Sequence, residues 1–107
     1  MDRGYIYVNT TNLKKNLSYL SSMTKKELCL VVKANAYGHG IQWSVKTAEG
    51  AGINWFAIAS VNEAIQVRNI SKNARILLLA EPSKTEIKNV LKNEIDLTVY
   101  NEEFINE

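Results

Sequence analysis

The side chains most capable of chemistry are concentrated between Val31 and Gly40, in the segment VVKANAYGHG. Lys33 comes directly after an apolar run, and a lysine amine that is buried or lies near a cation is neutral part of the time. A neutral amine can attack a carbonyl carbon and form a Schiff base. Tyr37 follows after one short loop, where its hydroxyl could hydrogen-bond an anionic group held beside Lys33. The segment is therefore suited to covalent binding of a carbonyl compound by Lys33. Taken residue by residue, a lysine that extends its amine to water and a tyrosine ring that packs are the more common alternatives.

The end of this segment bears on what else it could bind. Gly38 and Gly40 allow close approach of the backbone, and a helix expected to start near Ile41 offers free amides to a phosphate. Their spacing matches neither of the glycine-rich nucleotide-binding patterns. His39 has no second histidine or cysteine at ligand spacing and no obvious serine nucleophile. We therefore predict no metal site and no catalytic triad, and a structural role for His39.

Two kinds of segment alternate along the chain and must position these residues. Short apolar runs are typical of strands buried on both faces of a parallel sheet. They predict strands at Leu28–Val32, Trp55–Ala59, Ile76–Ala80 and Leu97–Tyr100, after a short leading strand at Tyr5–Val8. Apolar residues at helical spacing predict helices near 13–23, 41–48, 64–67 and 87–91, and one more opening near Asn101. Capping boxes, in which a hydroxyl and a carboxylate each satisfy a backbone amide, are expected at Ser60–Glu63 and Ser83–Glu86.

This alternation of strands and helices predicts an α/β fold with a parallel sheet. The repeat of about twenty to thirty residues is the size of one strand–helix–strand unit. The pattern fits either a doubly wound sheet or part of a (β/α)8 barrel of the TIM type, because periodicity does not reveal strand order. A complete barrel needs roughly 200 residues or more, so the 107 residues of this chain could form about half of one.

Composition narrows the class of protein. A chain of 107 residues with 46% hydrophobic and 22% charged residues is an ordinary single globular domain. A net charge of +2 with scattered lysines gives no reason to expect a nucleic-acid partner. Cys29 is the only cysteine, so it is expected to be a buried small hydrophobe with no internal disulfide, as in a reducing cytoplasm. No signal peptide or membrane-spanning segment is expected.

The segment from Val31 to Gly40 resembles the pyridoxal-phosphate signature of the alanine racemase family at every position. The resemblance extends to other parts of the chain, which are similar to the family's first helix, the next helix-to-strand passage, its "EA…LR" helix and the two strands after it. These parts are Asn12–Leu17, Gly50–Ala59, Glu63-Ala64 with Arg68, Ile76–Leu79 and Leu97–Tyr100. Residues 1–107 are therefore identified as part of the N-terminal domain of an alanine racemase.

The resemblance implies a cofactor and a role for four residues. Lys33 would carry pyridoxal 5'-phosphate covalently and would act as the catalytic base for the Cα proton on the D-alanine face. Tyr37 would bind the cofactor's phosphate, and Val31 and Leu79 would line the cofactor pocket. No residue is expected to bind a metal. The implied function is the interconversion of L-alanine and D-alanine for peptidoglycan synthesis, by a cytoplasmic homodimer.

The resemblance also implies what the rest of such an enzyme supplies. The family has a (β/α)8 barrel followed by a β-rich C-terminal domain, which is expected to be absent here. The second catalytic base, a tyrosine of the partner subunit, would belong to that domain. Because half a barrel leaves edge strands unpaired, we expect either a truncated piece that is inactive alone or an assembly that pairs halves.

Other functions stay open at this point. The chain could be a single-domain protein that holds pyridoxal phosphate without racemase activity, or a structural remnant whose site is no longer used. Lys33 would then extend its amine to water and Tyr37 would pack as a half-buried ring. Serine racemases and racemases of broader specificity share the barrel, so the amino-acid substrate also stays open.

Overall fold

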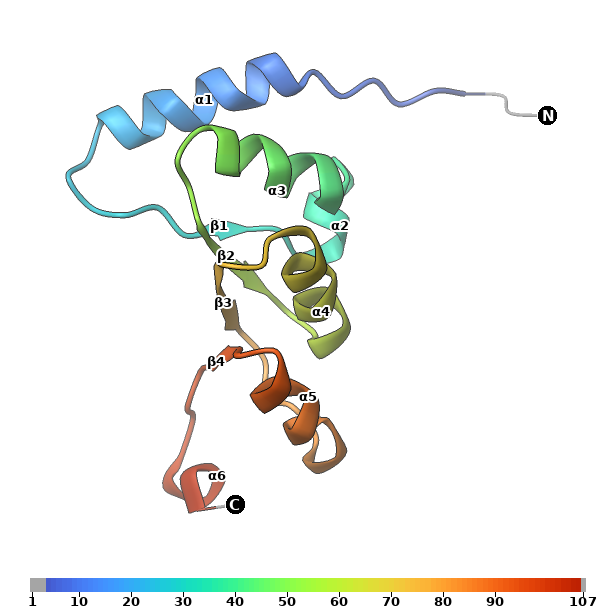
Figure 1. Cartoon of the computed structure of the whole chain (residues 1–107), viewed down its shortest axis with the longest axis vertical. Helices are drawn as coiled ribbons and strands as arrows, with labels where there is room; N and C mark the ends of the chain where they lie inside the picture. The colour runs from blue at the N-terminus through green and yellow to red at the C-terminus, as the bar shows by residue number, and fades with distance from the viewer. Residues whose placement is uncertain (1–3, 107) are drawn as a thin grey trace.

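The computed structural model describes residues 4–106; the first three residues of the N-terminal segment, where no signal peptide was expected, lie outside this range. Strands and helices alternate as the sequence predicts (Figure 1). In chain order they are α1 (Thr10–Ser22), β1 (Leu30–Val31), α2 (Lys33–Tyr37), α3 (Ile41–Gly50), β2 (Trp55–Ile58), α4 (Val61–Ile70), β3 (Arg75–Leu78), the 3-10 helix η1 (Lys84–Glu86), α5 (Ile87–Lys92), β4 (Asp96–Leu97) and α6 (Glu102–Asn106).

The four strands form one sheet in the order β1-β2-β3-β4, and every neighbouring pair is parallel. Leu30 of β1 is level with Phe56 of β2, and Phe56 is level with Ile76 of β3. A doubly wound sheet reverses direction at one point, so its strand order is not sequential. The sequential order seen here is that of a barrel, which decides between the two architectures that the sequence left open.

One face of the sheet carries the hydrophobic core. Side chains alternate between the two faces of a strand, so the even-numbered residues of β1, β2 and β3 share a face, and Leu97 of β4, level with Leu78, shares it too. In Figure 1, α3, α4 and α5 all lie on the same side of the sheet. The core joins the even-numbered strand residues to apolar residues of the helices: Val32, Phe56, Ile58, Ile76 and Leu78 with Leu17, Val45, Ala48, Ala64, Val67 and Val90. Burial of these side chains holds the helices against the strands.

No helix among residues 4–106 lies on the opposite face of β1, β2 and β3 (Figure 1). Val31, Ala57 and Leu77 are level with one another on the three neighbouring strands, and they belong to this face. Val31 and Leu77 are only partly buried, whereas Val32, Ile76 and Leu78 on the other face are almost fully buried; Ala57, between them on β2, is buried too. In a closed (β/α)8 barrel the helix-free face points inward. The carboxyl end of this face is therefore the edge at which a barrel site would form.

Local hydrogen bonds mark several helix starts. The side chain of Asn9 accepts from Asn12 N at the start of α1, and Asn101 Oδ1 accepts from Phe104 N at the start of α6. The capping box at Ser83–Glu86 is confirmed. The one at Ser60–Glu63 is half right, since Ser60 Oγ accepts from Glu63 N but the Glu63 carboxylate binds other amides.

The prediction of a leading strand at Tyr5–Val8 is wrong. This segment is extended but pairs with no strand among the described residues, and Tyr7 is 90% exposed. Figure 1 shows it leaving the body of the molecule beyond α1. Its alternation of aromatic and aliphatic side chains suits a strand, but a strand also needs a neighbouring strand with free backbone groups. Within residues 4–106, no helix has the length and apolar character needed to cross a membrane.

Arg68 ties together the loops at the amino ends of β3 and β4. Its guanidinium donates to five backbone carbonyls: Asn93 at 2.9 Å, Ser71 at 3.4 Å, Lys72 at 3.1 Å, Ala74 at 2.6 Å and Glu94 at 3.1 Å. An arginine fork is suited to this because it carries five N–H donors in a fixed plane. Arg68, one of the residues that resemble the "EA…LR" helix, therefore has a structural role.

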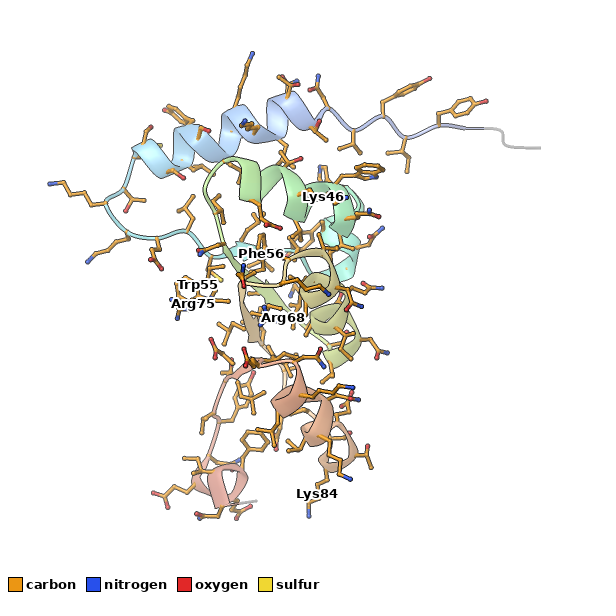
Figure 2. The ribbon with its side chains drawn as sticks, in the orientation of Figure 1. Lys46, Trp55, Phe56, Arg68, Arg75 and Lys84 are labelled. Atoms are coloured by element: carbon orange, nitrogen blue, oxygen red, sulfur yellow. The ribbon has the colours of Figure 1, made fainter. Side chains whose placement is uncertain are left out.

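A second arginine lies on the helix-free face at the same end of the sheet. Arg75 stacks on the ring of Trp55, with 4.3 Å from the guanidinium carbon to the ring centroid, and lies 3.5 Å from the Glu27 carboxylate. Figure 2 shows Trp55 and Arg75 on the side of the sheet away from the helices. Cys29 is partly rather than fully buried, which corrects the sequence-based expectation. Burial raises the pKa of its thiol, and the positive charge of Arg75 offsets part of that rise.

Candidate cofactor site

Lys33 lies at the carboxyl end of β1, as the sequence predicts. Val32 N donates to Ala57 O at 2.9 Å, the final bond from this segment to β2, and Lys33 is the next residue. Its side chain is half-buried. The carboxyl ends of parallel strands are where sheets of this kind place their functional residues.

The residues after Lys33 form a left-handed turn. Ala34, Asn35, Ala36 and Tyr37 have φ values of 53°, 54°, 56° and 54°, and none of them is glycine. Left-handed backbone costs about 1–2 kcal/mol per residue for L-amino acids and occurs mostly at single residues. Four consecutive residues in this conformation are strained, and such strain is concentrated at functional sites. The sequence predicted only a short loop here.

A set of backbone and side-chain hydrogen bonds holds this turn. Ala36 N donates to Val32 O at 2.9 Å, and Gly40 N donates to Asn35 O at 2.9 Å. Asn35 Oδ1 accepts from Ile41 N at 2.9 Å, which ties the turn to the start of α3. His39 Nδ1 lies 3.0 Å from Ala36 O, so the ring is held by the loop, in agreement with the structural role predicted for it.

Glu63 is a residue of the site that sequence reasoning missed. Its carboxylate accepts from Ala34 N at 2.7 Å and from Ala59 N at 3.0 Å. It therefore joins the residue after Lys33 to the end of β2. Its spacing from Ser60 predicted a local helix cap, and its place in the segment that resembles the "EA…LR" helix assigned it no contact. The contact to Ala34 spans 29 residues.

The other predicted site residues lie around the same edge of the sheet. Leu79 N donates to Ile58 O at 2.8 Å, so pairing with β2 continues to Leu79, two residues beyond Leu77 and on the same face. Val31 is on that face too, in β1, which lies two strand spacings or roughly 10 Å across the sheet from β3. Tyr37 ends the left-handed turn and is 60% exposed. The helix-free face thus includes Val31 and Leu79. Lys33 lies beside it at the end of β1, and Tyr37 lies in the turn that follows.

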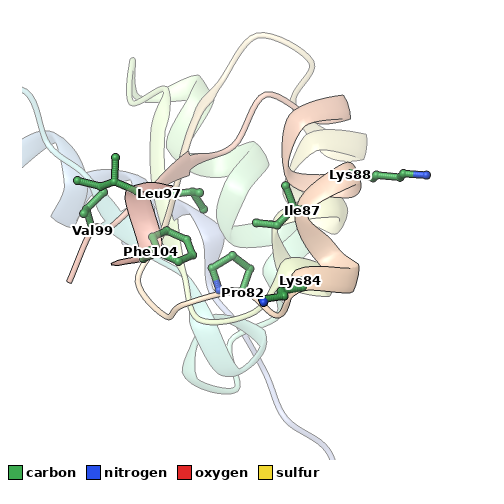
Figure 3. Close-up of a pocket in the computed structure, with 8 residues that line it drawn as sticks. Pro82, Lys84, Ile87, Lys88, Leu97, Val99 and Phe104 are labelled. Carbon is green, nitrogen blue, oxygen red and sulfur yellow. The ribbon is translucent and has the colours of Figure 1, made fainter. Parts of the chain in front are cut away.

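A cavity of about 640 Å³ lies elsewhere, near the last helix (Figure 3). Phe104 of α6 faces Ile87 of α5 and Pro82 across it. Its lining is mostly apolar and includes none of the residues around Lys33: Pro82, Lys84, Ile87, Lys88, Leu97, Val99, Phe104 and Ile105. This cavity is therefore separate from the predicted site around Lys33.

The fold and site define a class of protein. A parallel sheet in sequential order with helices on one face is the N-terminal part of a (β/α)8 barrel. Its half-buried Lys33 lies at the carboxyl end of a strand, where such barrels place their functional residues. The family described as "Alanine racemase, N-terminal domain" matches residues 8–107. The chain belongs to this family, which confirms the resemblance found in the sequence.

Individual relatives agree with the family match. The alanine racemase of Treponema denticola is 37% identical over 102 residues, which are 94% of this chain and 27% of that protein. The crystal structure of alanine racemase from E. faecalis matches with a TM-score of 0.87 at 28% identity, over 92% of this chain and 27% of that one. A histidine racemase from Leuconostoc mesenteroides subsp. sake matches with a TM-score of 0.84 at 25% identity, over 92% and 27%. The chain thus spans 27% of the length of each.

Proposed function

We propose that this chain carries the cofactor lysine of a pyridoxal-phosphate-dependent racemase that interconverts L-alanine and D-alanine. The observation that supports this most is the position of Lys33, at the carboxyl end of a barrel strand and before a strained turn. Membership of the alanine racemase family supplies the expected substrate. The match to a histidine racemase makes other amino acids worth testing.

The residues present fit pyridoxal phosphate by their chemistry. A flat ring needs apolar surface, and Val31, Leu77 and Leu79 provide it on the helix-free face. An aldehyde needs an amine, which Lys33 has at the edge of that surface. A phosphate needs donors, and the exposed Tyr37 hydroxyl can act as one.

The proposed roles follow from these positions. Lys33 would bind the aldehyde carbon of the cofactor through its amine, and Tyr37 would donate to the phosphate. Val31 and Leu79 would pack against the ring. Tyr37 comes four positions after Lys33, close to the 3.6 residues of one helical turn, so the left-handed turn brings Tyr37 back toward the strand end. When bound, the cofactor takes up the electron pair that remains after an amino acid loses its Cα proton.

Racemisation also requires proton transfer on both faces of the substrate. The Lys33 amine would accept or return the proton on the D-alanine face. The second base is the tyrosine that the resemblance places in a C-terminal domain of the partner subunit. We therefore expect little or no D-alanine from these 107 residues alone. A homodimer, a cytoplasmic site of action and a role in peptidoglycan synthesis belong to the same proposal, and family membership is what supports them.

The experiment is covalent trapping. The full chain is mixed with pyridoxal phosphate, reduced with borohydride and mapped by peptide mass, in parallel with Lys33→Ala and with Lys46→Ala as a matched control on exposed α3. We expect one preferred pyridoxyl-lysine, at Lys33, and loss of most bound cofactor only in Lys33→Ala. Equal labelling of the chain and of Lys33→Ala would exclude Lys33 as the anchor. A second assay measures racemase activity in a full-length homologue whose corresponding segment is replaced by residues 1–107. Preferred labelling of Lys33 without activity in that protein would favour the alternative that the chain holds pyridoxal phosphate without racemising an amino acid.

A further inference from the structure

Glu63 connects two parts of the site that are distant in sequence. Its Oε2 accepts from Ala34 N at 2.7 Å and its Oε1 accepts from Ala59 N at 3.0 Å. The Glu63 backbone is itself fixed, because Glu63 N donates to Ser60 Oγ at 3.2 Å in the first turn of α4. One half-buried carboxylate therefore joins β2, α4 and the residue that follows Lys33.

The contact to Ala34 acts on Lys33 directly. Ala34 N belongs to the peptide bond that joins Lys33 to Ala34, and that peptide unit is planar. Fixing its N–H therefore fixes ψ of Lys33, which sets the direction in which the lysine side chain leaves the backbone. Bonds from a backbone N–H to a carboxylate are charge-assisted and about twice as strong as neutral ones.

The strain of the turn explains why such a contact is needed. Ala34 is the first of four consecutive non-glycine residues with positive φ. A strained backbone persists only where its surroundings fix it. Asn35 and Gly40 hold the far end of the turn through their mutual bond and the cap on Ile41. The near end is held by the bond from Ala36 N to Val32 O and, at the residue next to Lys33, by the Glu63 carboxylate.

We propose that Glu63 is a positioning residue for Lys33: its carboxylate bridge between Ala34 N and Ala59 N keeps the amine of Lys33 at the site where a carbonyl cofactor binds. This inference rests on the proposed function of Lys33. It differs from a helix cap, in which the carboxylate would bind the amide of Ser60. Glu86 supplies the comparison, because its carboxylate accepts from Ser83 N at 3.0 Å in an ordinary capping box.

The test uses Glu63→Gln and Glu86→Gln in the full chain. Glutamine keeps one acceptor oxygen, so Glu63→Gln leaves one of the two amides without its acceptor. Glu86→Gln removes the same charge far from Lys33, where Oε1 alone accepts from Ser83 N and that contact can remain. The first readout is hydrogen exchange at the Ala34 amide. The second is the share of borohydride-trapped pyridoxal phosphate on Lys33 relative to the other lysines.

We expect Glu63→Gln to lower the share of label on Lys33 on the order of tenfold and to speed exchange at Ala34, because misplacement of a reacting group by about 1 Å has effects of this size or larger. Glu86→Gln should change neither. Glu63→Asp keeps the charge at the helix start but is one methylene too short to bridge both amides, so it should lose Lys33 labelling like Glu63→Gln while keeping more stability.

Each outcome decides something different. A Glu63→Gln protein that labels Lys33 at the parent share overturns the positioning role and leaves the proposed function intact. A folded Glu63→Asp protein with the parent share of label on Lys33 also overturns the positioning role, since the negative charge alone would then be enough for that labelling. A parent chain that shows no preference for Lys33 overturns the proposed function and this inference with it.

Discussion

The two ends of the parallel sheet use their polar side chains differently. At the amino ends of the strands, Arg68 donates to backbone carbonyls, and Arg75 contacts the Trp55 ring and the Glu27 carboxylate. At the carboxyl ends, Glu63 binds backbone amides beside Lys33. In barrels of this kind, the amino end serves stability and the carboxyl end serves function. The contrast within this chain follows that division.

Backbone strain is distributed in the same way. At the amino end, Glu94 is a single residue with a positive φ of 52°, placed just after α5, where many helices end in a left-handed residue. At the carboxyl end, four such residues follow one another from Ala34 to Tyr37. Glu94 ends a helix in an ordinary manner, whereas the turn from Ala34 to Tyr37 stores strain next to Lys33.

The largest expected effect is at the amino end, in Arg68→Met. This change keeps much of the apolar stem but leaves five carbonyls without their donor, so we expect the free energy of unfolding to fall by about 3 kcal/mol. The measurement is equilibrium unfolding in urea. Lys46→Met, which removes a charge from the exposed face of α3, should cost under about 0.5 kcal/mol. If Arg68→Met were as mild as this control, the amino end would not have the stabilising role assigned to it.

The comparison also shows what the sequence could predict. The parallel α/β fold, the approximate positions of the four strands and the Ser83–Glu86 cap were predictable because periodicity and capping depend on residues close in sequence. The exact strand ends were not, since β4 ends at Leu97 rather than Tyr100. The leading strand at Tyr5–Val8 was predicted wrongly because pairing depends on a distant partner that local pattern does not reveal. Strand order was left open for the same reason.

The candidate site divides in the same manner. Lys33 was predictable because a polar residue directly after an apolar strand lies at its carboxyl end. The left-handed turn was not predictable, since alanine at positions 34 and 36 does not indicate a positive φ. Only the later glycines, Gly38 and Gly40, favour one. Glu63 was assigned to its local partner, Ser60, because spacing cannot show a bond to Ala34.

The second prediction tests strain at the carboxyl end. Glycine has no penalty for positive φ, so Ala34→Gly should raise the free energy of unfolding by about 1 kcal/mol, after allowing for the greater freedom of glycine in the unfolded chain. Urea unfolding measures it. Glu94→Gly should give a similar gain, and Lys46→Gly, within right-handed α3, should lose about 1 kcal/mol. A loss in Ala34→Gly would show that the turn is not strained.

A smaller effect is expected for Arg75→Gln. The change removes the stacking of a cation on Trp55, which contributes about 0.5–1 kcal/mol at an exposed site. Glu27→Gln should cost under about 0.5 kcal/mol, since both partners of that ion pair are more than half exposed, at 54% and 72%. Thermal or urea unfolding of the two variants separates stacking from charge pairing. Equal losses would mean that the ion pair, rather than the ring, holds Arg75.

The smallest expected effect concerns Cys29, which lies near Arg75 at the amino end. Burial raises the pKa of the thiol, and Arg75 offsets only part of the rise. The unfolded thiol therefore releases its proton at a lower pH than the folded one. Above about pH 8.5, the ordinary pKa of cysteine, the folded chain binds more protons than the unfolded chain, so stability should fall as pH rises.

Two measurements isolate this effect from the other groups that titrate in the same range. The slope of unfolding free energy against pH between about 8.5 and 10 should be more negative for the parent chain than for Cys29→Ala, because the other titrating groups are common to both. Alkylation of Cys29 by iodoacetamide at about pH 8 should be slower in the folded chain than in urea, since the thiolate is the nucleophile. Arg75→Gln should slow it further, because the charge that offsets the effect of burial is gone. Faster alkylation in Arg75→Gln would instead mean that the arginine acts by covering the sulfur, and the amino end would then protect Cys29 by packing rather than by charge.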